Sequence, residues 1–332
     1  MPERRIFSRR AADSEPILSF GAWRDLTSDV LSVCHPEWRG VRTSAFAFRD
    51  PVIETRDAGP HAEEIIEGAL AAGVTTLVVH GFPPGTDTLL RAAHKGRLNT
   101  RVVVHSSMAQ HGAEAGEAAV MDEIVRLAAA GVVNRIGFVK AGLAEAFRAL
   151  GVEAHHTPNR SPVMPTVERI ALDGDRPHIG VFGALYWRKN VVTQLGAVAI
   201  LRGTAHVMSK PAVAYLDRLA IVEHGELDRD RFLAVQASTD INLYVTLSEC
   251  HPMGPMESYL SGVPALVSRT SNLFWSDAAL FDVTTTEWPD DPHAIAVATK
   301  RLLADSSVVV RAQEWLERAD TKAEERWAEF LR

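Results

Sequence analysis

The segment from Leu243 to Ser268 reads LYVTLSECHPMGPMESYLSGVPALVS and gives the clearest indication of the fold class. An apolar run that ends at Ser248 predicts a buried strand, and Gly262 predicts the end of a short helix. We expect this helix to begin near Pro255, because proline suits a first helical position that needs no amide donor. The run VPALVS then predicts the next strand, so the segment forms one strand, loop and helix unit of a parallel sheet.

The two acidic residues of this segment, Glu249 and Glu257, fall at the carboxyl ends of the strands, where open α/β sheets bind ligands. We expect the amides of Gly254, Met256 and Glu257 to point outward from the helix start as donors to an anion or to sugar hydroxyls. Ionised carboxylates accept strong hydrogen bonds from the same hydroxyls. The alternatives are a helix-capping role for Glu257 and a solvated loop position for Glu249.

The rest of the chain alternates short β-rich runs with amphipathic helical runs, a pattern that predicts parallel sheets. In the first half, strands are expected over 29–35, 75–81, 101–107, 134–140 and 152–158. Helical runs over 60–73, 117–131 and 141–151 each end in a glycine suited to a left-handed C-cap. In the second half, strands are expected over 178–185, 205–210, 219–225, 239–248 and 263–268, with helices over about 190–201 and 228–238.

The domain organisation follows from a proline-containing interruption over 160–177, which predicts a linker. We predict an N-terminal domain over 1–160, a linker over 161–176, a C-terminal domain over 177–310 and a terminal helix over 311–332. The expected fold class is α/β, with two tandem Rossmann-like doubly wound domains, a cleft between them and the terminal helix packing across. Trp315 and Trp327 are expected to anchor that helix.

Composition excludes several classes of function. The formal charge of −7 gives no signal for a general polyanion partner such as nucleic acid, so phosphate binding needs a local basic cluster. Two cysteines, Cys34 and Cys250, do not form a disulfide framework and fit a reducing cytoplasm. No apolar run approaches the ~20 residues that cross a bilayer.

The N-terminus, MPERRIFSRR, lacks the apolar run of a signal peptide. We therefore expect a cytoplasmic protein. A short basic run at the N-terminus is expected to be a solvated tail. The alternative is a peripheral contact with the inner membrane surface or with nucleic acid. That run consists of Arg4, Arg5, Arg9 and Arg10.

Two segments carry a resemblance to a known family. SECHPMGPMESYLSGVPALVS resembles the Glu-x7-Glu segment of family-4-like GT-B glycosyltransferases. IGVFGALYWRKNVVTQLGAVAIL, from Ile179 to Leu201, is similar to the family's first donor-domain strand, glycine turn and Lys-Asn helix start. The resemblance implies a GT-B glycosyltransferase of the hexosyltransferase type, whose donor is a nucleotide-diphosphate sugar such as a UDP- or GDP-sugar. Members of such families generally need no metal and retain the anomeric configuration.

The resemblance makes the N-terminal domain the acceptor side and the C-terminal domain the nucleotide-sugar donor domain, and it implies roles for individual residues. Glu257 would hold the donor ribose, Glu249 would hold the sugar, and Lys189 with Arg188 would bind the diphosphate. The family's arginine after the turn glycine is replaced by Ala184. The full implied donor-binding set is Gly183, Arg188, Lys189, His224, Leu227, Met253, Gly254, Pro255 and Met256.

On the acceptor side, Gly40 and His105 resemble the positions that face the transferred sugar. The alternative for His105 is a structural role. The alternative for Arg188 and Lys189 is that both are solvated surface cations. At the level of the whole protein, the alternatives are a noncatalytic nucleotide-sugar-binding or scaffold protein and a GT-B-fold epimerase or hydrolase. The sequence assigns no acceptor class.

Other motifs point to no further chemistry. The run DGD at Asp173 to Asp175 sits in the predicted linker close to Pro177, which favours a turn over a metal site. We assign no metal and no cofactor besides the co-substrate. Neither half carries Gly-x-Gly-x-x-Gly, which argues against a dinucleotide oxidoreductase.

Overall fold

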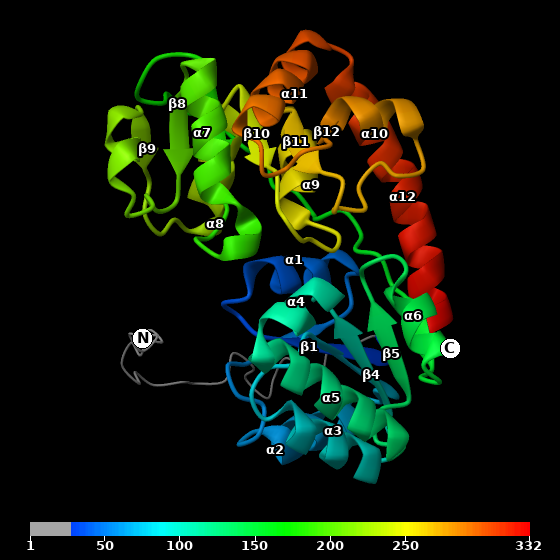
Figure 1. Cartoon of the computed structure of the whole chain (residues 1–332). Helices are drawn as coiled ribbons and strands as arrows, with labels where there is room; N and C mark the ends of the chain where they lie inside the picture. Colours follow the sequence, from blue (N-terminus) through cyan, green and yellow to red (C-terminus); the bar gives the residue numbers. More distant parts are fainter. Residues whose placement is uncertain (1–27) are drawn as a thin grey trace.

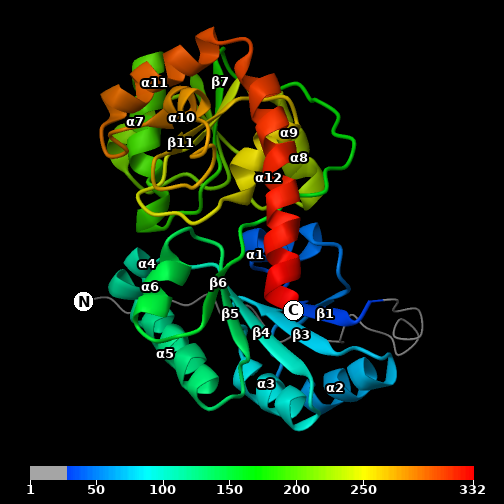
Figure 2. The same cartoon turned by 90° about the vertical axis from the view of Figure 1, so that its right-hand side faces the viewer.

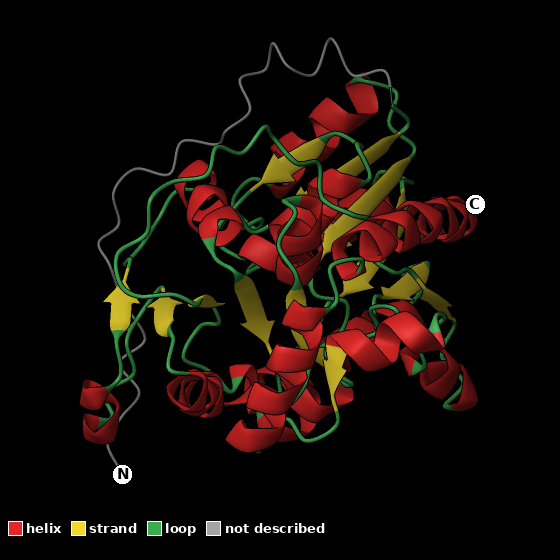
Figure 3. Cartoon of the chain, turned by 90° about the horizontal axis from the view of Figure 1, so that it is seen from above, coloured by secondary structure: helices red, strands yellow, loops and turns green. Residues whose placement is uncertain are grey.

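The computed structural model describes residues 28–332, and the four arginines of the basic N-terminus lie outside that range. Two parallel six-stranded sheets form the centres of two domains stacked on one another (Figure 1). Helices lie on both sides of the strands when the chain is seen from above (Figure 3). The predicted pair of Rossmann-like domains is therefore confirmed.

The first sheet has the strand order β2-β1-β3-β4-β5-β6. Its strands are β1 (Val30–Cys34), β2 (Val52–Glu54), β3 (Thr76–His80), β4 (Asn99–Val104), β5 (Arg135–Phe138) and β6 (Ala154–His156). Its helices are α1 (Arg39–Ala47), α2 (Ala62–Ala71), α3 (Thr86–Lys95), α4 (Met108–Ala113), α5 (Ala115–Ala129) and α6 (Leu143–Ala149). Strands β1 and β3 are buried at every position, which explains their largely apolar sequences.

The second sheet has the strand order β12-β11-β10-β7-β8-β9. Its strands are β7 (His178–Val181), β8 (Thr204–Val207), β9 (Ile221–Glu223), β10 (Ile241–Tyr244), β11 (Ala265–Ser268) and β12 (Thr285–Thr286). Its helices are η2 (Trp187–Lys189), α7 (Val191–Leu201), η3 (Ala214–Arg218), α8 (Arg229–Ser238), α9 (Met253–Leu260), α10 (Ala278–Thr284) and α11 (Pro292–Ala304). The strand order reverses between β7 and β10, and ligands of doubly wound domains bind at this switch point.

Two boundaries in the segment over 243–268 differ from our prediction. Strand β10 ends at Tyr244, four residues before Ser248, and α9 begins at Met253, two residues before Pro255. Pro255 is thus the third helical residue, which costs no hydrogen bond because the first helical amides have no partner within the helix. The helix stops as predicted, with Gly262 in a left-handed conformation at φ 80.

The terminal helix α12 (Val308–Leu331) joins the two domains (Figure 2). Trp315 lies in the core of the C-terminal domain, with its ring centroid 5.0 Å from that of Phe274. Trp327 stacks on Phe48 of the N-terminal domain at 4.3 Å. The predicted packing of the helix across both domains is confirmed, and both tryptophans anchor it. None of the helices in residues 28–332 combines the length and apolar composition needed to cross a membrane.

Candidate functional site

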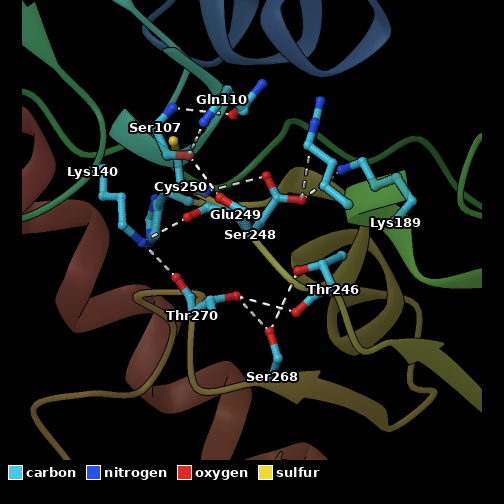
Figure 4. Close-up of polar contacts among 12 residues, drawn as sticks. Ser107, Gln110, Lys140, Lys189, Thr246, Ser248, Glu249, Cys250, Ser268 and Thr270 are labelled. Atoms are coloured by element: carbon cyan, nitrogen blue, oxygen red, sulfur yellow. Dashed lines mark hydrogen bonds and ion pairs between the residues drawn. The ribbon is translucent and has the colours of Figure 1, made fainter. Parts of the chain in front are cut away.

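The carboxyl edges of the two sheets face each other across the domain interface. Ser107, after β4, and Ser248, after β10, share a hydroxyl–hydroxyl hydrogen bond of 2.7 Å (Figure 4). The side-chain nitrogen Nδ2 of Asn159, after β6, donates to the backbone carbonyl of His251 at 2.6 Å. The loop over 245–252, which we call the donor loop, therefore lies directly against the N-terminal domain.

The turn after β7 is tied to the donor loop by backbone and side-chain contacts. Asn190, in a left-handed conformation, donates through its buried side chain to the carbonyl of Val245 at 3.1 Å. The amide of Leu247 donates to the carbonyl of Arg188 at 2.8 Å. These contacts bring two segments about 60 residues apart in sequence to the switch point of the sheet.

Gly183 allows this turn to approach α7. A Cβ at Gly183 would lie 3.2 Å from Cβ of Lys189 and 3.3 Å from Cγ2 of Val191. A side chain there would push the basic helix start away from the sheet. The glycine therefore has a steric role at the turn.

The central contact of the site joins Lys189 to Glu249. Nζ of Lys189 lies 2.5 Å from Oε2 of Glu249, and Nη1 of Arg188 lies 3.9 Å from the same oxygen (Figure 4). Burial by itself raises the pKa of Glu249, but Lys189, Arg188 and the Cys250 amide bring that pKa below its ordinary value. Two cations and one ionised carboxylate thus lie side by side at the switch point. This combination of charges suits a ligand with both phosphate and hydroxyl groups.

The start of α9 supplies fewer free amides than we predicted. Because the helix begins at Met253, the amides of Met256 and Glu257 are bonded within the helix, and those of Met253 and Gly254 remain. The side chains of Met253 and Met256 are buried in the domain core. Pro255 is also buried, so this stretch offers a ligand backbone groups only.

Glu257 lies on α9 and forms an ion pair with Arg229. Oε1 of Glu257 lies 2.8 Å from Nη1 of Arg229, the first residue of α8. The same nitrogen donates to Oγ1 of Thr43 in α1 at 3.4 Å. Burial raises the pKa of Glu257 and Arg229 opposes that rise. Glu257 therefore stands at the domain interface, paired with an arginine that our sequence reasoning missed.

The predicted base-binding loop, His224 to Leu227, precedes that arginine. Nε2 of His224 lies 3.0 Å from Nδ1 of His206 in β8. The carbonyl of Leu227 accepts from Arg39 of α1 at 3.0 Å. The loop is thus held between the second sheet and the N-terminal domain, and its role toward a base stays a prediction.

The two acceptor-side candidates lie in different surroundings. Gly40 is the second residue of α1, and a Cβ there would meet no atom within 4 Å, so the space beside it is open. The His105 ring lies 5.6 Å from that of His80, and its Nε2 is buried with no hydrogen-bond partner in the described part of the chain. Burial lowers the pKa of His105 to about 3, so its imidazole is neutral near pH 7. Their contact with a sugar stays a prediction.

Lys140 is a second interface residue that sequence reasoning missed. Its Nζ donates to the backbone carbonyls of Glu249 and Thr270, each at 2.6 Å (Figure 4). The signal was present in the sequence, since this charged residue closes the apolar run that forms β5 at the ligand-binding edge of its sheet.

Two other features lie outside this site. A cavity of about 210 Å³ is lined by residues of α6, β6 and α12, but its arginines, Arg148 and Arg326, each pair with a glutamate of their own helix. Asp173 to Asp175 form a bend around Gly174 at φ 100. Within residues 28–332 no group of three or more His, Cys, Asp or Glu side chains is arranged to hold a metal ion.

Comparison with known proteins supports the fold. The sequence matches no family model and no curated protein. A UDP-forming α,α-trehalose-phosphate synthase from Burkholderia xenovorans, in complex with glucose-6-phosphate, superimposes with a TM-score of 0.60 at 11% identity, covering 91% of this chain and 99% of that one. Sucrose-phosphate synthase from Thermosynechococcus elongatus gives 0.53 at 16% identity, covering 85% and 76%. The chain therefore has the GT-B fold of these enzymes, as expected from its sequence.

Proposed function

We propose that the protein is a glycosyltransferase that moves a sugar from a nucleotide-diphosphate donor to an acceptor hydroxyl. The observation that carries this proposal is the contact of Lys189 with Glu249 at the switch point of the second sheet. A chance surface ion pair would not require two loops from adjacent strands to be tied together, as they are here by Asn190 and Leu247. A cytoplasmic location is part of the proposal, and Cys34 and Cys250 are both unpaired and buried.

In this proposal each residue type has a chemical role. Lys189 and Arg188 neutralise the donor diphosphate, Glu249 accepts hydrogen bonds from the sugar, and Glu257 accepts from the ribose. The acceptor hydroxyl oxygen bonds to the anomeric carbon as the bond from that carbon to the diphosphate breaks, and the hydroxyl proton passes to the leaving diphosphate oxygen. Negative charge then grows on the leaving diphosphate, where fixed cations lower the barrier. Metal independence and retention of configuration are proposed from the family resemblance.

The replacement of the family's arginine by Ala184 changes how the diphosphate is bound. Ala184 is exposed and adds no charge to the turn. Arg188 lies four residues later with its side chain 18% exposed and its guanidinium near Glu249. In the proposal Arg188 supplies the missing positive charge.

The test is incubation of the purified protein with a panel of nucleotide sugars and cell extract, followed by mass spectrometry. UDP-glucose with glucose-6-phosphate is the first pair to try, because a structural neighbour is UDP-forming and carries that sugar phosphate. A new glycosylated product that disappears with Glu249→Gln supports the proposal. Free sugar without a glycosylated product identifies the hydrolase or epimerase alternative, and binding without turnover identifies the noncatalytic one.

A further inference from the structure

We propose that Lys140 is a positioning residue for the donor. From the N-terminal domain its ammonium group holds the backbone of the donor loop, so that the sugar half of the donor site is complete only when the two domains are in contact. This inference rests on the proposed function for the identity of the ligand. The contacts that carry it are independent of that function.

The acceptors of Lys140 show what it holds. Both are backbone carbonyls, at Glu249 after β10 and at Thr270 after β11, and both distances are 2.6 Å. The side chain of Glu249 has its own cations in Lys189 and Arg188. Lys140 therefore fixes the path of two loops and leaves the charge balance of the carboxylate to other residues.

The donor loop depends on the N-terminal domain over four consecutive residues, 248–251. Cys250 is 2% exposed and packs in an apolar cluster with Val139 of the N-terminal domain and Trp327 of α12. The other three residues make hydrogen bonds: Ser248 to Ser107, Glu249 to Lys140, and His251 to Asn159. A loop held in this way takes its conformation from the opposite domain as much as from its own.

The two carbonyls held by Lys140 belong to loops that are also bonded to each other. Oγ1 of Thr270 lies 2.7 Å from Oγ of Ser268 and donates to the carbonyl of Thr246 at 3.3 Å (Figure 4). Lys140 thus binds an already connected unit. Hydrogen bonds from an ammonium group are roughly twice as strong as neutral ones, and a partly buried setting strengthens them further.

The first experiment compares Lys140→Met with Lys300→Met, an exposed lysine of α11, by titration calorimetry. The donor that binds the wild type and the matching nucleoside diphosphate are titrated into each variant. For Lys140→Met we expect the Kd of the nucleotide sugar to rise about tenfold and that of the nucleoside diphosphate by less than about twofold. An equal rise in Kd for both ligands, or no rise for either, would overturn the proposal. A general loss of structure would weaken the binding of both ligands alike.

The second experiment needs no ligand and separates this inference from the proposed function. Amide hydrogen exchange of the donor loop should be faster in Lys140→Met than in the wild type and unchanged in Lys300→Met. Unchanged exchange in Lys140→Met would refute the role of Lys140 even if the protein proves to be a glycosyltransferase. Faster exchange in a protein that binds no nucleotide sugar would instead refute the function and leave the loop contact standing.

Ser248→Ala serves as a second variant, because it removes the Ser107 contact and keeps Lys140. If Lys140→Met does not fold, this variant decides the outcome. We expect a smaller acceleration of donor-loop exchange and a smaller loss of nucleotide-sugar affinity, in the same direction. An unchanged donor loop in Ser248→Ala would then contradict the dependence of the loop on the N-terminal domain.

Discussion

At the scale of single residues, Glu249 keeps its charge in a nearly buried position because cations lie beside it. Its side chain is 12% exposed, and Lys189 and Arg188 outweigh the effect of burial on its pKa. An acid with a lowered folded-state pKa stabilises the fold above its unfolded value and loses that contribution as the pH falls through the folded value.

The first prediction concerns this pH dependence. The gap in thermal stability between wild type and Glu249→Gln should be constant above about pH 4.5, the ordinary pKa of the group, and should shrink below it. The gap itself should be about 1–3 kcal/mol, as for a lost hydrogen bond to a charged group. Melting curves from neutral pH to about pH 3 measure it, and a gap that widens in acid would contradict the assignment.

The second prediction concerns Glu257. Glu257→Ala should lower kcat/KM by about 100-fold or more, because the donor loses a charged contact at the site. The melting temperature should change little, since burial of this carboxylate is unfavourable and only partly offset by Arg229. Glu317→Ala, at an exposed position of α12, is the control. Full activity in Glu257→Ala would exclude the residue from the site.

At the scale of elements, the sequence predicted several helices and strands but missed others, including the 13-residue helix α11. The helical runs ending at Gly73, Gly131 and Gly151 form α2, α5 and α6, and all three glycines have positive φ. The strand β2 was missed because its three residues stand between Pro51 and the polar run Thr55–Asp57, which together indicate a loop. Helix α3 was missed because the preceding residues FPPG, with two prolines and a glycine, indicate a loop. In the structure Gly85 is left-handed and directly precedes the helix.

The candidate site, too, was predicted only in part. The family resemblance implied that Lys189 and Glu249 serve one site, and the structure brings the two side chains into contact after strands that flank the switch point. The partners Lys140 and Arg229 were not predictable from local pattern. Lys140 is 109 residues from Glu249 in sequence, and that contact depends on how the two domains are placed.

The third prediction concerns the packing of α9 on β10. A Cβ at Gly254 would lie 2.8 Å from Cε1 of Tyr244, which is partly buried against the core of the C-terminal domain. Gly254→Ala should therefore destabilise the protein by about 1–3 kcal/mol and weaken donor binding as α9 shifts. Gly116→Ala, in open space on α5, is the matched control and should be neutral or stabilising. Denaturant titration measures both, and equal stability of the two variants would contradict the contact.

At the scale of the whole molecule, α12 makes the two domains one unit. Its end packs on the first sheet through Trp327 and Phe330, and Arg101 of β4 donates to the carbonyl of Phe330 at 3.0 Å. Close to its middle, Asp320 accepts from the amide of Ser161 in the interdomain segment at 2.7 Å. The helix therefore stabilises the domain contact on which the donor loop depends.

The fourth prediction tests that role. Trp327→Ala removes the stacking on Phe48 and the hydrogen bond to Asp50, and should cost about 3–5 kcal/mol. Trp275→Ala, at a position that is 60% exposed, is the control and should cost much less. Chemical denaturation followed by circular dichroism compares them. Equal stability of the two variants would show that α12 does not hold the N-terminal domain.

The most direct test of the donor site is calorimetric titration of nucleoside diphosphates into wild type, Lys189→Ala and Lys300→Met. Lys189 lies at the switch point beside Glu249, whereas Lys300 is exposed on α11. We predict that at least one diphosphate binds the wild type and Lys300→Met equally, and binds Lys189→Ala about tenfold more weakly or not at all. Equal affinity of all three proteins, or no binding by the wild type, would contradict the proposed donor site.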